Sequence, residues 1–197
     1  MKIISAKFIK SATNPSQYPQ GSLPEIAFVG KSNVGKSSLI NILVSRKKLA
    51  KTSATPGRTQ LINFFEINNR ISLVDLPGYG YARVPHEIKK NWKPMVENYL
   101  YQRKNLKSVV VIFDIRRTPS RDEFSMIRWI EELGISVLIV LTKIDKVSKS
   151  SLTKQKKIFV SFFPEKKDDF IVFSAITRVG KEAIWKKVAQ NISLSGD

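Results

Sequence analysis

The segment GKSNVGKSS at residues 30–38 constrains the fold of this chain more than any other stretch. It follows the apolar run EIAFVG at 25–30 and leads into KSSLINILV at 36–44, where apolar residues recur at helical spacing. A Gly-x-x-x-x-Gly-Lys-Ser loop between a strand and a helix places backbone N–H groups around a phosphate. The sequence therefore predicts a nucleoside triphosphate site, with a Gly-rich turn around an incidental lysine as the alternative.

Two side chains of this loop have specific expected roles. Lys36 adds a positive charge beside the phosphates, and the Ser37 hydroxyl can reach a magnesium ion. We expect every residue of the loop to contact the nucleotide: Gly30, Lys31, Ser32, Asn33, Val34, Gly35, Lys36, Ser37 and Ser38.

Apolar and β-branched runs alternate with helical patterns along the chain. Strands are expected near 25–30, 60–67, 70–75, 108–114, 136–142 and 169–174, and helices at 36–45, 86–104, 121–133, 150–162 and 179–192. Continuously apolar strands such as SVVVIFD and SVLIVLT indicate a parallel sheet that helices cover on both faces. We therefore expect a doubly wound α/β fold with a mostly parallel sheet.

The ends of this pattern set the expected organisation. Residues 60–67 and 70–75 are separated by an Asn-Asn turn, which predicts one antiparallel pair at a sheet edge. The first 24 residues predict an arm or short strand, 25–192 the core and 193–197 a tail, so 1–197 forms one domain.

Composition excludes several classes of protein. The chain has 197 residues, of which 42% are hydrophobic, so it can bury one core. The lack of cysteine and the single histidine, His86, argue against disulfides and zinc sites. No apolar run approaches the roughly 20 residues that span a bilayer, and because lysines interrupt the apolar stretches of MKIISAKFIK we expect no signal peptide. We expect a soluble cytoplasmic protein.

A second motif, DLPGYG at 75–80, follows an apolar strand. Asp75 at the strand end can hold magnesium through water, and Gly78 can offer its backbone N–H to a γ-phosphate. Leu76 and Pro77 complete the predicted contact segment. A Pro-Gly turn without function is the alternative, and the loop at 30–38 favours the functional interpretation.

A third motif, TKID at 142–145, predicts the base. The Asp145 carboxylate can accept hydrogen bonds from the N1–H and 2-amino groups of guanine, which adenine lacks, so it would select GTP. Lys143 can lay its aliphatic stem over the base. The predicted base contacts are Thr142, Lys143, Asp145, Ser174 and Ala175, the last through its backbone N–H.

The ordered segments GKSNVGKSS, TPGRTQLINFF, DLPGYGYA, TKID and SA resemble the TrmE-Era-EngA-EngB group of GTPases. Together with SATNPSQYP and DLPGYGYARV, they are most similar to the EngB (YihA/YsxC) family of bacterial ribosome-biogenesis GTPases, over essentially the whole chain. The resemblance implies a P-loop GTPase that binds GTP and GDP with Mg²⁺. It also implies a switch in assembly of the large ribosomal subunit, needed for normal cell division and septation.

The resemblance also assigns roles to individual residues. Thr59 in PGRT, with Gly57 and Arg58, matches the first switch, which closes on magnesium and the γ-phosphate. The implied catalytic residues are Lys36, Thr59 and Gly78, and the implied metal ligands are Ser37, Thr59 and Asp75. Arg117 and Ile144 depart from the His and Ala that are commoner in the family, but neither position belongs to the predicted nucleotide contacts.

One expected group is missing from the second switch. Many GTPases orient the attacking water with a Gln directly after the switch glycine, whereas this chain has Tyr79. We therefore expect slow hydrolysis that a partner or a monovalent cation accelerates. Asn33 is the candidate for holding potassium, because relatives use an Asn there; a turn-forming Asn is an equal alternative.

The charge balance predicts a polyanionic partner. Lys and Arg total 34 against 16 acidic residues, a formal net charge of +18. The resemblance points to ribosomal RNA of the large subunit or its precursor, and we expect a monomer that binds neither membrane nor DNA. The structural alternative is that the lysines only solvate the exposed helix faces. The functional alternative is an RNA-binding assembly module with a sensing nucleotide site and negligible turnover.

Overall fold

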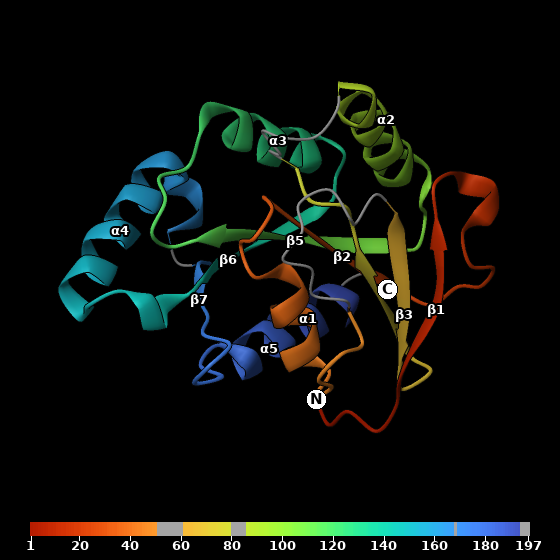
Figure 1. Ribbon diagram of the computed structural model, residues 1–197, viewed down its shortest axis with the longest axis horizontal. Helices are drawn as coiled ribbons and strands as arrows, with labels where there is room; N and C mark the ends of the chain where they lie inside the picture. The colour runs from red at the N-terminus through yellow and green to blue at the C-terminus, as the bar shows by residue number, and fades with distance from the viewer. Residues whose placement is uncertain (51–60, 80–85, 168, 194–197) are drawn as a thin grey trace.

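The computed structural model describes residues 1–50, 61–79, 86–167 and 169–193. Its centre is a seven-stranded sheet in the order β1-β3-β4-β2-β5-β6-β7, with helices on both faces (Figure 1). The strands are β1 (Ala6–Ala12), β2 (Glu25–Gly30), β3 (Ile62–Ile67), β4 (Ile71–Asp75), β5 (Leu106–Asp114), β6 (Ser136–Thr142) and β7 (Ile171–Val172). The helices are α1 (Lys36–Leu43), α2 (His86–Gln102), α3 (Arg121–Glu132), α4 (Lys149–Phe162) and α5 (Lys181–Ser193).

The pairing of the strands confirms the predicted doubly wound, mostly parallel α/β fold. β4, β2, β5, β6 and β7 pair in parallel, and β3 pairs antiparallel with β4 through the Asn68–Asn69 turn. Both turn residues have left-handed backbone conformations, with φ of 55° and 53°, which Asn tolerates well. The predicted position of this hairpin at the sheet edge is wrong: it lies one strand in, because β1 pairs antiparallel with the outer side of β3.

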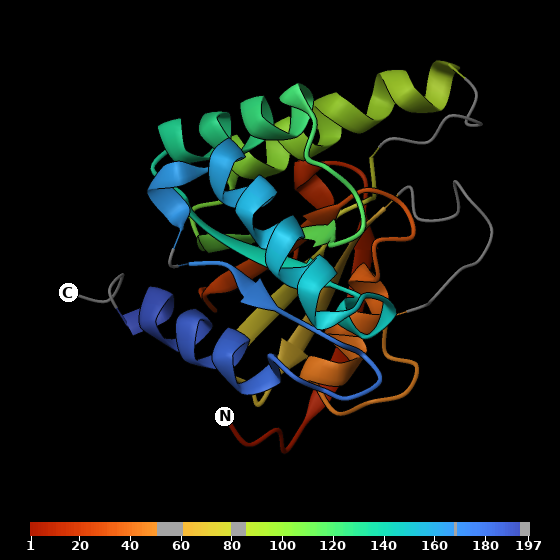
Figure 2. The same ribbon diagram turned by 90° about the vertical axis from the view of Figure 1, so that its left-hand side faces the viewer.

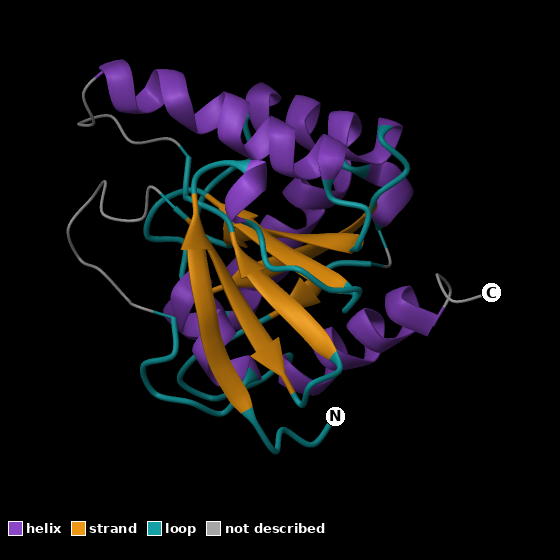
Figure 3. Cartoon of the chain, turned by 90° about the vertical axis from the view of Figure 1, so that its right-hand side faces the viewer, coloured by secondary structure: helices purple, strands orange, loops and turns teal. Residues whose placement is uncertain are grey.

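Two apolar layers hold the helices on the sheet. On one face, α1 packs against β2 and α5 packs against β5 and α1, and the Trp185 indole Nε1 donates to the Leu43 carbonyl at 3.1 Å. On the other face, Tyr99 of α2, Ile127 of α3 and Phe159 of α4 are fully buried in a second layer. Figures 2 and 3 show these two helical layers on opposite sides of the strands.

Some element boundaries differ from the predicted ones for local conformational reasons. Helix α1 stops at Leu43 because Ser45 adopts a left-handed φ of 54°, and α5 begins after Gly180, whose φ is 88°. β7 contains two residues where 169–174 was predicted to be a strand, and β6 is its only strand neighbour in the described sheet. No helix among the described residues is both long enough and apolar enough to cross a bilayer.

The N-terminal strand β1 forms one outer edge of the sheet. Its register shifts between Phe8 and Lys10, which marks a β-bulge. Phe8 packs edge-on against Phe65 of β3, with ring centroids 5.8 Å apart, yet remains half exposed. Lys7 and Lys10 are exposed on the same strand. The predicted arm is therefore a short strand of the sheet.

A buried acidic group fastens the amino end of β2 to α2 and to the N-terminal segment. Glu25 is 2% exposed and accepts hydrogen bonds from the Tyr99 hydroxyl at 2.8 Å and from Arg103 at 2.6 Å. Arg103 also donates to the Pro19 carbonyl and lies over the Tyr18 ring. Because a buried carboxylate is costly unless it is paired, these contacts make the arrangement specific.

Candidate nucleotide site

The predicted motifs converge at one edge of the sheet. β2 ends at Gly30, β4 at Asp75, β5 at Asp114 and β6 at Thr142, and these strands are parallel. Their carboxyl ends therefore share an edge, which is where ligands bind in open α/β sheets. The sequence motifs that predicted phosphate, magnesium and base contacts are brought together there.

The backbone of the loop at 30–35 depends on two glycines. A Cβ at Gly30 would lie 2.8 Å from the Ile112 carbonyl oxygen and 2.9 Å from Val34, so no larger residue fits. Gly35 has a φ of 104°, which a residue with a side chain adopts only with strain. Gly35 precedes α1 without any side-chain cap, so the first N–H groups of that helix are available to an anion.

At the phosphate end, the two main charged groups contact each other directly. The Lys36 ammonium, at 9% side-chain exposure, is paired with Asp75 Oδ1 at 4%. A phosphate oxygen is the natural replacement for this carboxylate at Lys36. The short strand-to-loop and loop-to-helix connections therefore place the cation and the carboxylate within one small volume.

The oxygen donors near this pair suit magnesium. Ser37 lies in the first turn of α1, beside Lys36, and Asp75 ends the strand adjacent to β2. Hydroxyl and carboxylate oxygens fit Mg²⁺, which takes few protein ligands and keeps several waters and phosphate oxygens. Bound Mg²⁺ would neutralise phosphate charge. The third predicted ligand, Thr59, lies outside the described residues with Gly57 and Arg58.

The second switch segment is joined to the loop through its backbone. The Ser32 N–H donates to the Tyr79 carbonyl at 3.1 Å, and the Tyr79 N–H donates to the Gly30 carbonyl at 3.4 Å. Leu76 is buried and its N–H donates to the Phe28 carbonyl, which fixes where the segment leaves β4. The segment 76–79 therefore lies directly against the phosphate loop.

The Tyr79 side chain is directed toward α3. Its hydroxyl donates to Glu123 Oε1 at 3.2 Å, and Lys31 forms an ion pair with Glu123 Oε2 at 3.1 Å. Burial, and then the Glu123 charge, raise the pKa of Tyr79 far above its usual value, so the hydroxyl stays protonated and donates. Glu123 also accepts from Ser120 in a capping box, which anchors the network to α3.

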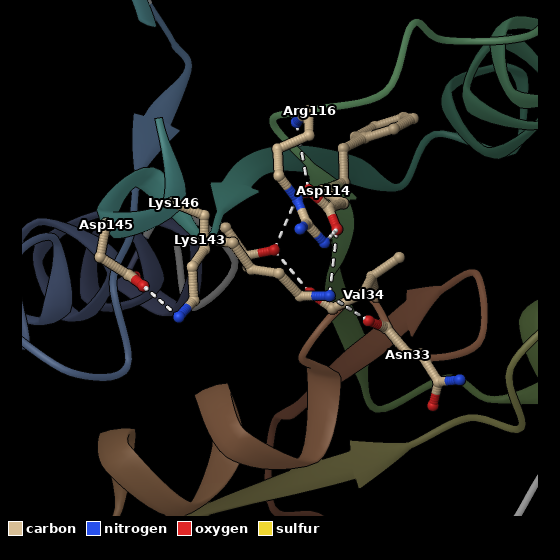
Figure 4. A network of polar contacts seen from close by, with 9 residues as sticks. Asn33, Val34, Asp114, Arg116, Lys143, Asp145 and Lys146 are labelled. Atoms are coloured by element: carbon tan, nitrogen blue, oxygen red, sulfur yellow. Dashed lines mark hydrogen bonds and ion pairs between the residues drawn. The ribbon is translucent and has the colours of Figure 1, made fainter. Parts of the chain in front are cut away.

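The base end is held by the network in Figure 4. Lys143 adopts a left-handed φ of 61° and extends its ammonium to Asp114 Oδ2 at 3.0 Å and to the Asn33 carbonyl. The Thr142 Oγ1 lies 2.5 Å from the Val34 carbonyl oxygen and 2.9 Å from the Phe113 carbonyl oxygen, so its single proton is shared between these two acceptors. These contacts tie the phosphate loop to the β6 end, so the two halves of the site have a fixed spacing.

Asp114 is the charged centre of this network. Arg116 contacts it with two guanidinium nitrogens, at 2.9 and 2.7 Å, and with its backbone N–H at 3.1 Å. Burial alone would raise the pKa of Asp114, but the hydrogen bonds from Arg116 and Lys143 outweigh it and hold the pKa well below the usual range. Asp114 is therefore ionised throughout the physiological range and orients Lys143.

The predicted base-selecting group is also supported by a neighbour. Ser174, which is fully buried, donates from Oγ to Asp145 Oδ1 at 2.7 Å and accepts the N–H groups of Ile176 and Thr177. A carboxylate oxygen accepts more than one hydrogen bond, so Asp145 can still receive donors from a base. Ala175 follows Ser174 directly, on the same loop.

Sequence reasoning missed several residues that shape the site. Asp114 ends a buried strand, as Asp75 does, and this shared position could have predicted that Asp114 belongs to the site. Glu123 stands three residues after Ser120, the spacing of a capping box. Asn41 exchanges two 2.8 Å hydrogen bonds with the Ala50 backbone and anchors the chain before the first switch; its position on α1 gave no signal.

Comparison with known proteins identifies the family. A model of the family described as 50S ribosome-binding GTPase matches residues 25–143. A protein of Citrifermentans bemidjiense named "Probable GTP-binding protein EngB" is 50% identical over 205 aligned residues, covering 100% of this chain and 96% of the relative. The chain belongs to the EngB family. The resemblance inferred from its motifs is confirmed.

Further members and structures agree with this EngB assignment. The EngB protein of Geobacter sulfurreducens is 54% identical over 188 residues, covering 95% of this chain and 91% of that protein. A crystal structure of a probable GTP-binding protein engB superposes with a TM-score of 0.71 at 25% identity, covering 86% of this chain and 98% of the other. Era bound to MgGDPNP and 16S ribosomal RNA nucleotides has a TM-score of 0.67 at 20% identity over 87% of this chain and 57% of Era, and shares the fold.

EngB membership settles the general activity of the site. The chain is a GTP-binding protein of a GTPase family, so GTP and GDP are its nucleotides and Mg²⁺ is the usual metal of such sites. The individual contacts assigned above to bases and phosphates remain predictions, now with defined positions for those that lie in the described residues.

Proposed function

We propose that this protein is a GTP-controlled assembly factor of the large ribosomal subunit that works as a cytoplasmic monomer. The observation that carries the proposal is the net charge of +18 on a chain whose family model is described as a 50S ribosome-binding GTPase. Ribosomal RNA is a dense polyanion, and a GTP site supplies a way to control when the protein binds it. Through subunit assembly the protein supports normal cell division and septation.

The charge is available to a partner on the described surface. On α4, Lys149, Lys154, Lys156 and Lys157 are all exposed, and that helix carries no acidic residue in its first turn. Lysines that neutralise RNA phosphates release counterions, so binding should weaken steeply as salt rises. Lysines that are only solvated would give no binding at any salt concentration.

The second proposed property is slow hydrolysis of GTP by the isolated protein. Tyr79 occupies the place of the water-orienting Gln, and its hydroxyl is engaged by Glu123. Hydrolysis should therefore depend on a group that a ribosomal particle or a cation supplies. Multiple-turnover assays with and without large subunits test this; turnover that stays negligible with particles would favour the RNA-binding module with a sensing site.

Potassium is the proposed cation, acting through the Asn33 carboxamide. Asn33 also has a left-handed φ of 64°, which by itself favours Asn, so the turn explanation must be separated. Asn33→Gly preserves this conformation and removes the carboxamide, whereas Asn33→Ala adds strain. If the carboxamide holds potassium, both variants lose the potassium-over-sodium stimulation; if Asn33 serves the turn, Asn33→Gly retains it.

The decisive experiment for the assembly function is sedimentation with purified large subunits. We expect tighter binding with a GTP analogue than with GDP, because Thr59 and Gly78 sense the γ-phosphate and present the basic switch segments 46–59 and 76–85. Thr59→Ala should abolish this nucleotide preference and leave the salt dependence intact. Equal binding in both nucleotide states by the wild type would contradict the switch.

A further inference from the structure

The Ser32 hydroxyl is a buried donor without a partner in the phosphate loop. Its Oγ is inaccessible to solvent and makes no hydrogen bond within the described part of the chain. Buried hydroxyls are nearly always hydrogen-bonded, and an orphan within a binding site commonly has its partner in the bound molecule. The hydroxyl is therefore free to donate to an acceptor that the described residues do not provide.

The position of Ser32 identifies where that acceptor lies. A Cβ at Gly78 would be 3.3 Å from Ser32 Oγ and 3.6 Å from Ser32 N, so the hydroxyl faces the switch glycine at contact distance. The Ser32 N–H is already used by the Tyr79 carbonyl at 3.1 Å. The hydroxyl is consequently the donor that Ser32 can offer at the junction between the loop and the second switch.

The neighbouring side-chain donors at this junction are occupied by protein carboxylates. Lys36 is paired with Asp75, while Lys31 and the Tyr79 hydroxyl both contact Glu123. Lys36 can exchange its carboxylate for a phosphate oxygen, but Lys31 and Tyr79 are directed toward α3. Ser32 thus supplies a donor beside Gly78 without the loss of an existing hydrogen bond.

We propose that Ser32 Oγ donates a hydrogen bond to the terminal phosphate of GTP and helps the protein distinguish GTP from GDP. The proposal rests on the assignment of this loop to a guanine nucleotide and adds a side chain to the γ-phosphate contact predicted for the Gly78 backbone. A hydrogen bond to an anionic phosphate oxygen is stronger than one between neutral groups. GDP has no such phosphate, so the contact contributes only in the triphosphate state.

The test compares Ser32→Ala with Ser108→Ala in the full-length protein. Ser108 in β5 is a matched control, because its hydroxyl is also buried and without a partner but lies within a strand. Calorimetry with a non-hydrolysable GTP analogue and with GDP should show about a tenfold loss of analogue affinity in Ser32→Ala. GDP affinity should change less than about twofold, and Ser108→Ala should change neither.

A second variant tests whether the hydroxyl or merely the shape is needed. Ser32→Cys keeps a similar side chain with a weaker donor, so its analogue affinity should fall between those of wild type and Ser32→Ala. Equal losses for the analogue and GDP, no loss in Ser32→Ala, or wild-type behaviour of Ser32→Cys would each overturn the role of Ser32. A wild-type protein that fails to prefer guanine over adenine nucleotides would instead overturn the assignment of the site.

Discussion

The two ends of the nucleotide site are built differently. At the base end, each functional side chain is held by a neighbour that can stay in place: Asp145 by Ser174, and Lys143 by Asp114. At the phosphate end, Lys36 and Asp75 hold each other and must separate for a phosphate or a metal to enter. The base end is thus preorganised, and the phosphate end must exchange partners.

This difference assigns separate tasks to the two ends. If Asp145 reads guanine as predicted, a preorganised base end would select it at little conformational cost, whatever the number of phosphates. On the proposed roles, the phosphate end gains contacts to the terminal phosphate only when a triphosphate binds, so the nucleotide state would be sensed there. Mutations at the base end should therefore change affinity for GTP and GDP equally, and mutations at the phosphate end should change them unequally.

The largest effect on GTP affinity is expected for Lys36→Ala. It removes the phosphate-binding charge and leaves Asp75 buried without its partner, so GTP binding should weaken by about 3 kcal/mol or more, beyond roughly 100-fold. Calorimetry measures the affinity. Lys93→Ala, which removes an exposed lysine of α2 paired with Glu97, is the charge-matched control and should bind normally. Unchanged GTP affinity in Lys36→Ala would refute the phosphate site.

Asp145→Asn should have the next largest effect, and it tests selection at the base end. The amide nitrogen of the new side chain is a donor that would face the donors of guanine. The binding of GTP and GDP should therefore both weaken by about 1–3 kcal/mol, whereas xanthosine nucleotides should bind more tightly. Competition binding with GTP, GDP and the tri- and diphosphates of xanthosine measures these changes in affinity. Asp169→Asn, which removes a half-exposed carboxylate paired with Lys187, is the control. Equal ATP and GTP binding by the wild type would contradict the assignment.

Ser174→Ala probes preorganisation without removal of a base contact. The loss of one donor to Asp145 should weaken GTP and GDP alike by about 1 kcal/mol, or roughly fivefold. A loss of affinity for only one of the two nucleotides would contradict the assignment of separate tasks to the two ends of the site. Ser161→Ala serves as the control, because Ser161 is an exposed serine of α4 whose hydroxyl contacts a helix carbonyl. Fluorescence titration with labelled GTP and GDP gives both values.

Asp114→Asn should have the smallest effect on GTP, about twofold, because Asp114 acts only by positioning Lys143. Its effect on stability should depend on pH. The folded-state pKa of Asp114 lies below the unfolded value near 4, so its stabilising effect is present above about pH 4 and is lost as pH falls through the folded value. Urea unfolding from about pH 7 downward should show wild type and variant converging in acid. A constant difference at every pH would contradict this.

The sequence predicted the features whose signals are local. Apolar runs located the parallel strands, and Gly30, Asp75 and Thr142 stand at their ends, so the convergence of the three motifs followed from the parallel order. The start of α1 at Lys36 followed from the loop pattern itself. These signals are contained in short segments and need no knowledge of distant contacts.

Features that depend on distant partners were not predictable in the same way. β1 lacks a clean alternation, since Lys7, Phe8, Ile9 and Lys10 are all exposed, and only its pairing with β3 makes it a strand. The role of Glu123 requires Lys31 and Tyr79, which come from two other parts of the chain. Such a side-chain network depends on how the N-terminus of α3 lies beside the loop and the second switch, which no short segment of the sequence records.

The β-bulge and lysines of β1 have a consequence for the protein in concentrated solution. An outer strand offers unpaired backbone groups to any other strand, and a long flat edge invites copies of a protein to aggregate. Here the bulge interrupts the regular spacing between Phe8 and Lys10, and Lys7 and Lys10 carry like charges along that edge. At the opposite edge, β7 has only two residues to offer. Geometry and charge therefore make both edges of the described sheet poor templates for strand addition, and they oppose the self-association that the exposed Phe8 and Ile9 would otherwise favour.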